Sequence, residues 1–215
     1  MLGRISFILT FFILLSGCQS KRHSKPTRKT VVQDIWPVKL DVPDWWHQIS
    51  ELEEEDKEYN KILKTPSILR GFDSLAVRVW FTCVPDSGDM INITYDKQSW
   101  MATLYRFKAK QGENGRTESL RFRSQIMQPK SGWNMFVSKL FSTGILELKD
   151  YTAFEKAYGG STNPSTVSVE VSTTSLYRFY QYPSLQSNLH IKDAAKLQAA
   201  IELMEGEFAY KTACQ

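Results

Sequence analysis

Arginines stand next to aromatic residues at period-two spacing in several stretches of this sequence that have the alternation of β-strands. Such pairs on a sheet can hold an anionic or sugar ligand through stacking and charge-assisted hydrogen bonds. They can also simply stabilise an exposed sheet face across strands, and both interpretations stay open. The binding face predicted from this shared parity comprises Arg78, Trp80, Trp100, Arg106, Arg121, Arg123, Arg178 and Tyr180, with Tyr182 beside them.

Local motifs for catalysis or metal binding are missing from the sequence. The three histidines, His23, His47 and His190, lie far apart, and no HExxH, CxxC or His/Cys cluster offers zinc ligands at usable spacing. There is no GxSxG elbow, P-loop or GxGxxG loop. We therefore expect no metal and no cofactor, although scattered residues could still meet in space as a catalytic triad.

An acidic run opens a predicted helix over residues 51–64 and comprises Glu51 and residues 53–56. Acidic side chains near a helix N-terminus complement the helix dipole. Five acids so close together on one helix cannot converge on a single ion. We expect this run to form a solvated face rather than a metal site.

The motif Leu15-Ser16-Gly17-Cys18 closes a short apolar run that starts after Arg4. The run has the length of a signal-peptide core and is too short to span a bilayer. The motif resembles the lipobox of bacterial lipoproteins, in which the cysteine thiol receives a diacylglyceryl group before cleavage. The resemblance implies that residues 1–17 are a signal peptide and that Cys18 is lipidated. An ordinary secretory signal and a short membrane anchor are the alternatives.

The excess positive charge of the chain lies near its start. The formal net charge is +4, but positions 1–30 hold six basic residues and no acidic one, so 21 basic and 23 acidic residues remain. The slightly acidic remainder argues against nucleic acid as a partner. Residues 18–35 are predicted to be a flexible basic tether, which acts as a spacer or contacts anionic headgroups or cell-wall polymer.

The residue after Cys18 is Gln19. In this it resembles outer-membrane lipoproteins of enteric bacteria, because an Asp at this position marks retention in the inner membrane. Acidic residues at this place mark surface export in some Bacteroidetes lipoproteins, and none occurs here. The resemblance thus implies anchoring in the outer membrane on its periplasmic face. The chain also resembles uncharacterised lipoproteins of Bacteroidetes, through the lipobox, the stretch Trp100–Tyr105 and Tyr177-Arg178-Phe179-Tyr180. That group implies no activity.

Two cysteines remain when Cys18 is lipidated, and in an oxidising periplasm Cys83 and Cys214 could form a disulfide. Such a bridge would join the C-terminal tail to the first long strand. The alternative is a buried free Cys83 and an incidental Cys214.

Residues 36–215 are predicted to form a single α+β domain, with amphipathic helices packed on one face of an antiparallel sheet. Period-two alternation predicts strands over residues 75–83, 90–95, 100–107, 119–127, 145–148, 166–171 and 176–182. The connections between them are too short for parallel crossovers. Helical spacing predicts helices over residues 51–64, 132–142, 151–158 and 192–208, whereas Trp36–Trp46 is expected to be irregular.

The anchor, the tether and the lack of catalytic motifs predict a non-enzymatic envelope protein. We expect the membrane as one partner, through the lipid, and an envelope protein or an anionic or glycan ligand as the other. A hydrolase of cell-wall or glycan substrates is the alternative, and a deep cleft with convergent carboxylates or with a His–nucleophile pair would distinguish it.

Overall fold

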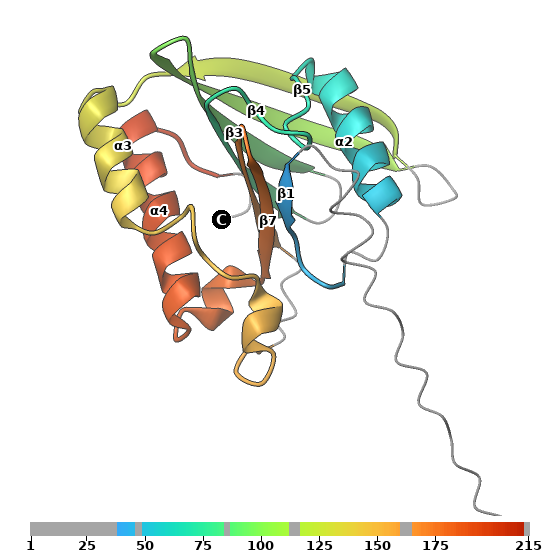
Figure 1. Cartoon of the computed structure of the whole chain (residues 1–215), viewed down its shortest axis with the longest axis vertical. Helices are drawn as coiled ribbons and strands as arrows, with labels where there is room; N and C mark the ends of the chain where they lie inside the picture. Colours follow the sequence, from blue (N-terminus) through green and yellow to red (C-terminus); the bar gives the residue numbers. More distant parts are fainter. Residues whose placement is uncertain (1–37, 46–48, 84–86, 112–116, 160–164, 213–215) are drawn as a thin grey trace, which may run out of the picture.

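The computed structural model describes residues 38–45, 49–83, 87–111, 117–159 and 165–212 (Figure 1). In this part of the chain, seven strands form one sheet in the order β1-β7-β6-β2-β3-β4-β5. The strands are β1 (Lys39–Asp41), β2 (Leu75–Cys83), β3 (Ser87–Asp96), β4 (Ser99–Gln111), β5 (Thr117–Met127), β6 (Thr166–Thr173) and β7 (Leu176–Pro183). The helices are α2 (Ile49–Leu63), α3 (Trp133–Ser142), α4 (Lys192–Phe208) and the short 3-10 helices η1 (Tyr151–Phe154) and η2 (Leu185–Asn188). The predicted α+β class is confirmed.

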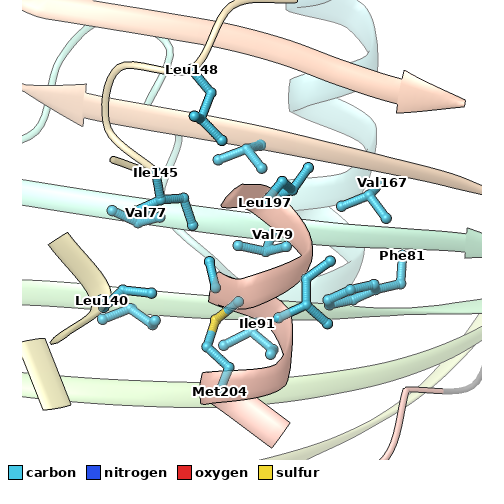
Figure 2. Close-up of a cluster of buried hydrophobic side chains, with 14 of the residues drawn as sticks. Val77, Val79, Phe81, Ile91, Leu140, Ile145, Leu148, Val167, Leu197 and Met204 are labelled. Carbon is cyan, nitrogen blue, oxygen red and sulfur yellow. The ribbon is translucent and has the colours of Figure 1, made fainter. Parts of the chain in front are cut away.

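The larger core lies between the sheet and the helices α3 and α4. Val77, Val79 and Phe81 point from alternate positions of β2 into this core (Figure 2). Leu197 and Met204 of α4 cover them, and the spacing of buried residues along α4 follows the helical period. We call this side of the sheet the core face.

Helix α2 packs on the opposite side of the sheet, away from α3 and α4 (Figure 1). Tyr59 of α2 meets Trp80 edge to face, with ring centroids 5.4 Å apart, and Leu63 is buried. The expectation that all helices share one face is therefore wrong for α2. The physical reason is that β2 lies in the middle of the sheet and buries Ala76 and Arg78 on this second side as well. We call it the α2 face.

Two other local predictions need correction. The segment Ile145–Leu148 is not a strand, because its carbonyl groups accept hydrogen bonds from side chains of β7, from Tyr180 at Ile145 and from Arg178 at Leu146. Residues 39–41, within the segment expected to be irregular, form β1, which pairs with β7 in parallel. The sheet is therefore mixed rather than wholly antiparallel.

In the described residues no helix is long and apolar enough to cross a membrane. The predicted signal peptide, lipobox and tether lie outside the described residues.

Candidate functional site

A pocket of about 430 Å³ lies between α2 and the α2 face of the sheet. Its floor is formed by side chains of three neighbouring strands, β2, β6 and β7, and α2 forms one wall. The volume falls in the range of small-molecule sites. The lining residues are Trp45, Asp56, Tyr59, Asn60, Arg78, Trp80, Thr82, Phe107, Ser168, Glu170, Tyr177, Phe179 and Gln181.

Strand register places the floor residues in two rows. In the first row, Trp80 lies opposite Ser168, which in turn lies opposite Gln181. In the second row, Glu170 lies between Arg78 and Phe179. Because cross-strand partners project to the same side of a sheet, hydroxyl, amide and carboxyl groups alternate with rings on the pocket floor.

Arg78 is a buried cation at the base of the pocket, with 1% of its surface exposed. Its guanidinium donates hydrogen bonds to the Asn60 side-chain oxygen at 3.0 Å and to the backbone carbonyl of Pro66. A longer bond of 3.4 Å reaches Asn92 on β3. Arg78 thus joins α2, the loop that follows it and two strands. An unpaired charge at this depth would be strongly unfavourable.

Two carboxyl groups approach the same nitrogen of Arg78. Asp56 Oδ1 and Glu170 Oε2 are each 3.9 Å from NH1. Asp56 also accepts hydrogen bonds from Asn60 and Ser67, which fixes its position at the α2 side of the pocket. The acidic run therefore does not form a uniformly solvated face, since the Asp56 side chain is only 11% exposed.

Glu170 has unusual electrostatics. Burial raises the pKa of its carboxyl group above the ordinary value, and the nearby positive charge of Arg78 partly opposes this effect. Trp80 donates its indole N–H to Glu170 at 2.6 Å, and Tyr177 forms a second side-chain hydrogen bond to Glu170. A buried carboxyl with a raised pKa can retain a proton at a pH where an exposed one would lose it.

Aromatic rings form both sides of the pocket. On one side, Tyr59, Trp80 and Phe107 meet edge to face with centroid distances of 5.4 to 6.4 Å. On the other side, Trp45 packs edge to face on Phe179 at 6.1 Å. Gly88 makes room for the first group, because a Cβ atom there would lie 2.7 Å from the Phe107 ring.

The charge balance of the site limits what it can hold. Arg78 is already engaged by neutral oxygens and by two carboxyl groups, so its charge is compensated inside the protein. An anionic ligand would meet two carboxyl groups around one guanidinium. The exposed surface of the pocket is instead a mixture of rings and uncharged polar groups, notably Ser168 and Gln181.

The structure divides the predicted binding face between the two sides of the sheet. Arg78 and Trp80 lie on the α2 face and line the pocket. The other members lie on the core face or at its margin by strand register, namely Trp100, Arg106, Arg121, Arg123, Arg178 and Tyr180, with Tyr182. The expectation of one shared face is therefore wrong, because parity within a strand does not relate one strand to the next.

Several of these residues have structural partners. Trp100 stacks on Trp133 with centroids 6.3 Å apart, and Tyr180 is buried, its hydroxyl donating to the carbonyl of Ile145 at 2.5 Å. Arg178 binds Asp41 and the carbonyl of Leu146. Arg106 donates to the carbonyl of Lys211 at 2.8 Å, whereas Arg121 and Arg123 are exposed on β5.

Cys83 is disulfide-bonded. The other two cysteines, Cys18 and Cys214, lie outside the described residues, so the pairing of Cys83 with Cys214 stays a prediction. In the described ranges, no group of three His, Cys, Asp or Glu side chains is arranged to hold a metal ion.

Most of the pocket was not predicted from the sequence, including Tyr59, Phe107, Glu170, Phe179 and Gln181. One signal was available for Glu170, since it is an acid between Val169 and Val171 within a predicted strand. A charge in such a position, with an arginine in another strand, is a candidate for a buried pair. No comparable pattern in the sequence indicated that residues of α2 would line a pocket.

Comparison with protein-family models, curated proteins and solved structures gives no match.

Proposed function

We propose that this protein binds an uncharged glycan in the pocket between α2 and the sheet, as a lipid-anchored protein on the periplasmic side of the outer membrane. The observation that carries the ligand proposal is a polar floor between two aromatic sides. Aromatic rings offer flat apolar surfaces, and the amide and hydroxyl groups between them can satisfy the hydroxyl groups of a sugar.

The distribution of charge supports a neutral ligand over an anionic one. The guanidinium of Arg78 is 1% exposed and already compensated, so it contributes little to an incoming anion. Gln181 and Ser168, in contrast, can each both donate and accept hydrogen bonds. The glycan alternative among the expected ligands is therefore the better one.

Hydrolysis of a glycan is the second candidate function. It is favoured by the two carboxyl groups, Asp56 and Glu170, each within 4 Å of the same Arg78 nitrogen, and by the raised pKa of Glu170. Glycosidases use two carboxyl groups, and the one that acts as general acid has a raised pKa. Binding without hydrolysis is preferred, because Trp80 and Tyr177 already use the Glu170 carboxyl group and a catalytic acid must reach the glycosidic oxygen.

A glycan array probed with the purified mature chain tests the binding proposal. We expect neutral oligosaccharides to be retained, and Gln181→Ala to weaken their binding about tenfold, because a lost hydrogen bond in a buried site costs about 1–3 kcal/mol. Gln125→Ala on β5 is the matched control, since this exposed glutamine lies outside the pocket. Equal binding by the two variants, or selection of anionic compounds alone, would contradict the proposal.

The same array separates binding from hydrolysis. Retained oligosaccharides are incubated with the wild-type chain and with Glu170→Gln, and reducing ends are measured. We expect no new reducing ends with either chain. Release by the wild type that disappears in Glu170→Gln would establish the hydrolase instead.

The anchor has its own test. Mass spectrometry of the protein extracted with detergent from its natural membrane should show a chain that starts at Cys18 and carries acyl groups. An intact Met1, or an unmodified Cys18, would exclude lipidation without affecting the pocket.

A further inference from the structure

The β4–β5 hairpin carries a second, independent feature on the core face, at the edge of the sheet. Five basic side chains share this side of the hairpin and are exposed. We call them the basic hairpin face, which consists of Arg106, Lys108, Lys110, Arg121 and Arg123. It lies on the opposite side of the sheet from the pocket.

Strand register places like charges directly opposite each other in this hairpin. Arg106 pairs with Arg123, and Lys108 pairs with Arg121. Two like charges in such positions repel each other and destabilise the pairing of the strands. For Arg106, part of the compensating charge comes from the buried carboxyl group of Asp89, which is 3.7 Å away. An external anionic surface would supply compensating charge to Lys108, Arg121 and Arg123.

Basic residues are concentrated in this part of the chain. Positions 99–127 hold six basic and two acidic residues, whereas the rest of positions 31–215 holds 15 basic and 21 acidic residues. The domain therefore has a positive edge on an otherwise acidic body. Such an asymmetry orients a molecule in the field of a charged surface.

Helices α3 and α4 do not cover this part of the core face. Met127, at the end of β5, is buried in the core, but Arg121 and Arg123 earlier in the strand are exposed. In Figure 1 the two helices lie near the end of β5 that leads into α3, away from the start of β5. Lys108, Arg121 and Arg123 thus stand on an open part of two adjacent strands, whereas Arg106 beside them contacts Lys211.

We propose that the basic hairpin face rests on the anionic phospholipid headgroups of the membrane. Adjacent strands are about 4.8 Å apart, so the cations form a nearly planar array, which suits the plane of a bilayer surface. A flexible tether of n residues reaches roughly 5–6 Å × √n, so a lipid on Cys18 would keep the domain close to that surface. Contact through the core face of the hairpin would direct the pocket on the α2 face away from the membrane.

The test is co-sedimentation of the mature chain, with Cys18→Ser to prevent lipidation, with vesicles of phosphatidylcholine alone or mixed with phosphatidylglycerol. We expect binding only to the mixed vesicles, and weaker binding as salt increases. The triple variant Lys108→Gln, Arg121→Gln, Arg123→Gln should bind about tenfold or more weakly, since each basic residue near an anionic surface contributes about 1 kcal/mol. Every variant keeps the basic tether, so the difference reports on the hairpin.

The matched control replaces three exposed lysines elsewhere, Lys61, Lys156 and Lys192, by Gln, and should change the binding less than twofold or so. Equal losses in the two triple variants would show an effect of net charge alone and overturn the proposal. So would wild-type binding by the hairpin variant, because the tether would then be the contact. Thermal unfolding checks that the hairpin variant is folded. The test uses neither the lipid proposed on Cys18 nor a glycan, so its result is independent of the proposed anchor and pocket.

Discussion

Arg78 is the residue on which the pocket depends, because its guanidinium connects α2 to the sheet through Asn60 and Pro66. Its charge is balanced by Asp56 and Glu170, and all three groups are largely withdrawn from water. Removing one member of a buried charged cluster leaves the others without compensation. The same cluster therefore shapes the pocket and stabilises the domain.

Replacing Arg78 by Leu should lower the free energy of unfolding by about 3–5 kcal/mol, the usual cost of breaking a buried ion pair from one side. Urea denaturation measures this loss. Arg70→Leu is the control, because Arg70 is 65% exposed in its ion pair with Glu53 and such pairs contribute about 1 kcal/mol or less. Similar losses for the two variants would mean that the Arg78 cluster is not critical.

The raised pKa of Glu170 predicts that the free energy of unfolding depends on pH. Burial raises its pKa in the folded protein above the ordinary value of 4.5, so the folded state holds this proton more tightly than the unfolded state. The resulting stability is present below pH 4.5 and is lost as the pH rises through the pKa of the folded state. Unfolding free energies measured from acid to neutral pH should therefore fall less steeply, or rise more steeply, in Glu170→Gln than in the wild type. Parallel profiles would contradict the assignment.

At the scale of elements, the central strands were predictable and their relative faces were not. Residues 75–83 alternate clearly, and β2 has the predicted bounds. In contrast, β1 is only three residues long and forms through its pairing with β7. Its own sequence shows no alternation that predicts a strand. The site joins Asp56, Arg78 and Glu170, which are distant in the sequence and meet only through the register of β2 with β6 and the packing of α2. Neither the register between two strands nor the packing of a helix on a sheet can be deduced from the alternation within a single strand.

The like-charge pairs of the β4–β5 hairpin predict a variant that is more stable than the wild type. Lys108→Gln removes the repulsion between Lys108 and Arg121 and should raise the free energy of unfolding by about 0.2–1 kcal/mol at low salt. The gain should shrink in high salt, which screens the repulsion. Lys156→Gln, at an exposed site outside the strands, should have little effect. A loss of stability in Lys108→Gln would show that the pairing is not repulsive.

At the scale of the whole molecule, the two faces of the sheet are assigned different tasks. The pocket lies on the α2 face and the basic hairpin face on the other side, at the far end of the strand order from β1. In the sequence, the predicted tether precedes β1. The proposed orientation thus combines a lipid attached through one edge of the sheet with a headgroup contact at the other edge.

The disulfide of Cys83 also belongs to the scale of the whole molecule, because its predicted partner, Cys214, is distant in the sequence. If its partner is Cys214, the bridge closes most of the domain, and its reduction should lower the free energy of unfolding by about 4–5 kcal/mol in the chain-entropy model. Denaturation with and without reductant measures this loss, and Cys83→Ser should make the two curves coincide. Two free thiols in the unreduced, denatured mature chain would exclude the bridge.

Hydrogen exchange with a neutral oligosaccharide retained on the array tests the central claim most directly, because it locates the bound glycan. We predict slower amide exchange in residues 56–63 of α2 and at the facing positions of β6 and β7, around Ser168 and Gln181, because these elements surround the pocket. The β4–β5 hairpin from Lys108 to Arg123 should be unaffected. Slower exchange confined to that hairpin, or unchanged exchange throughout α2, β6 and β7, would contradict a glycan site in this pocket.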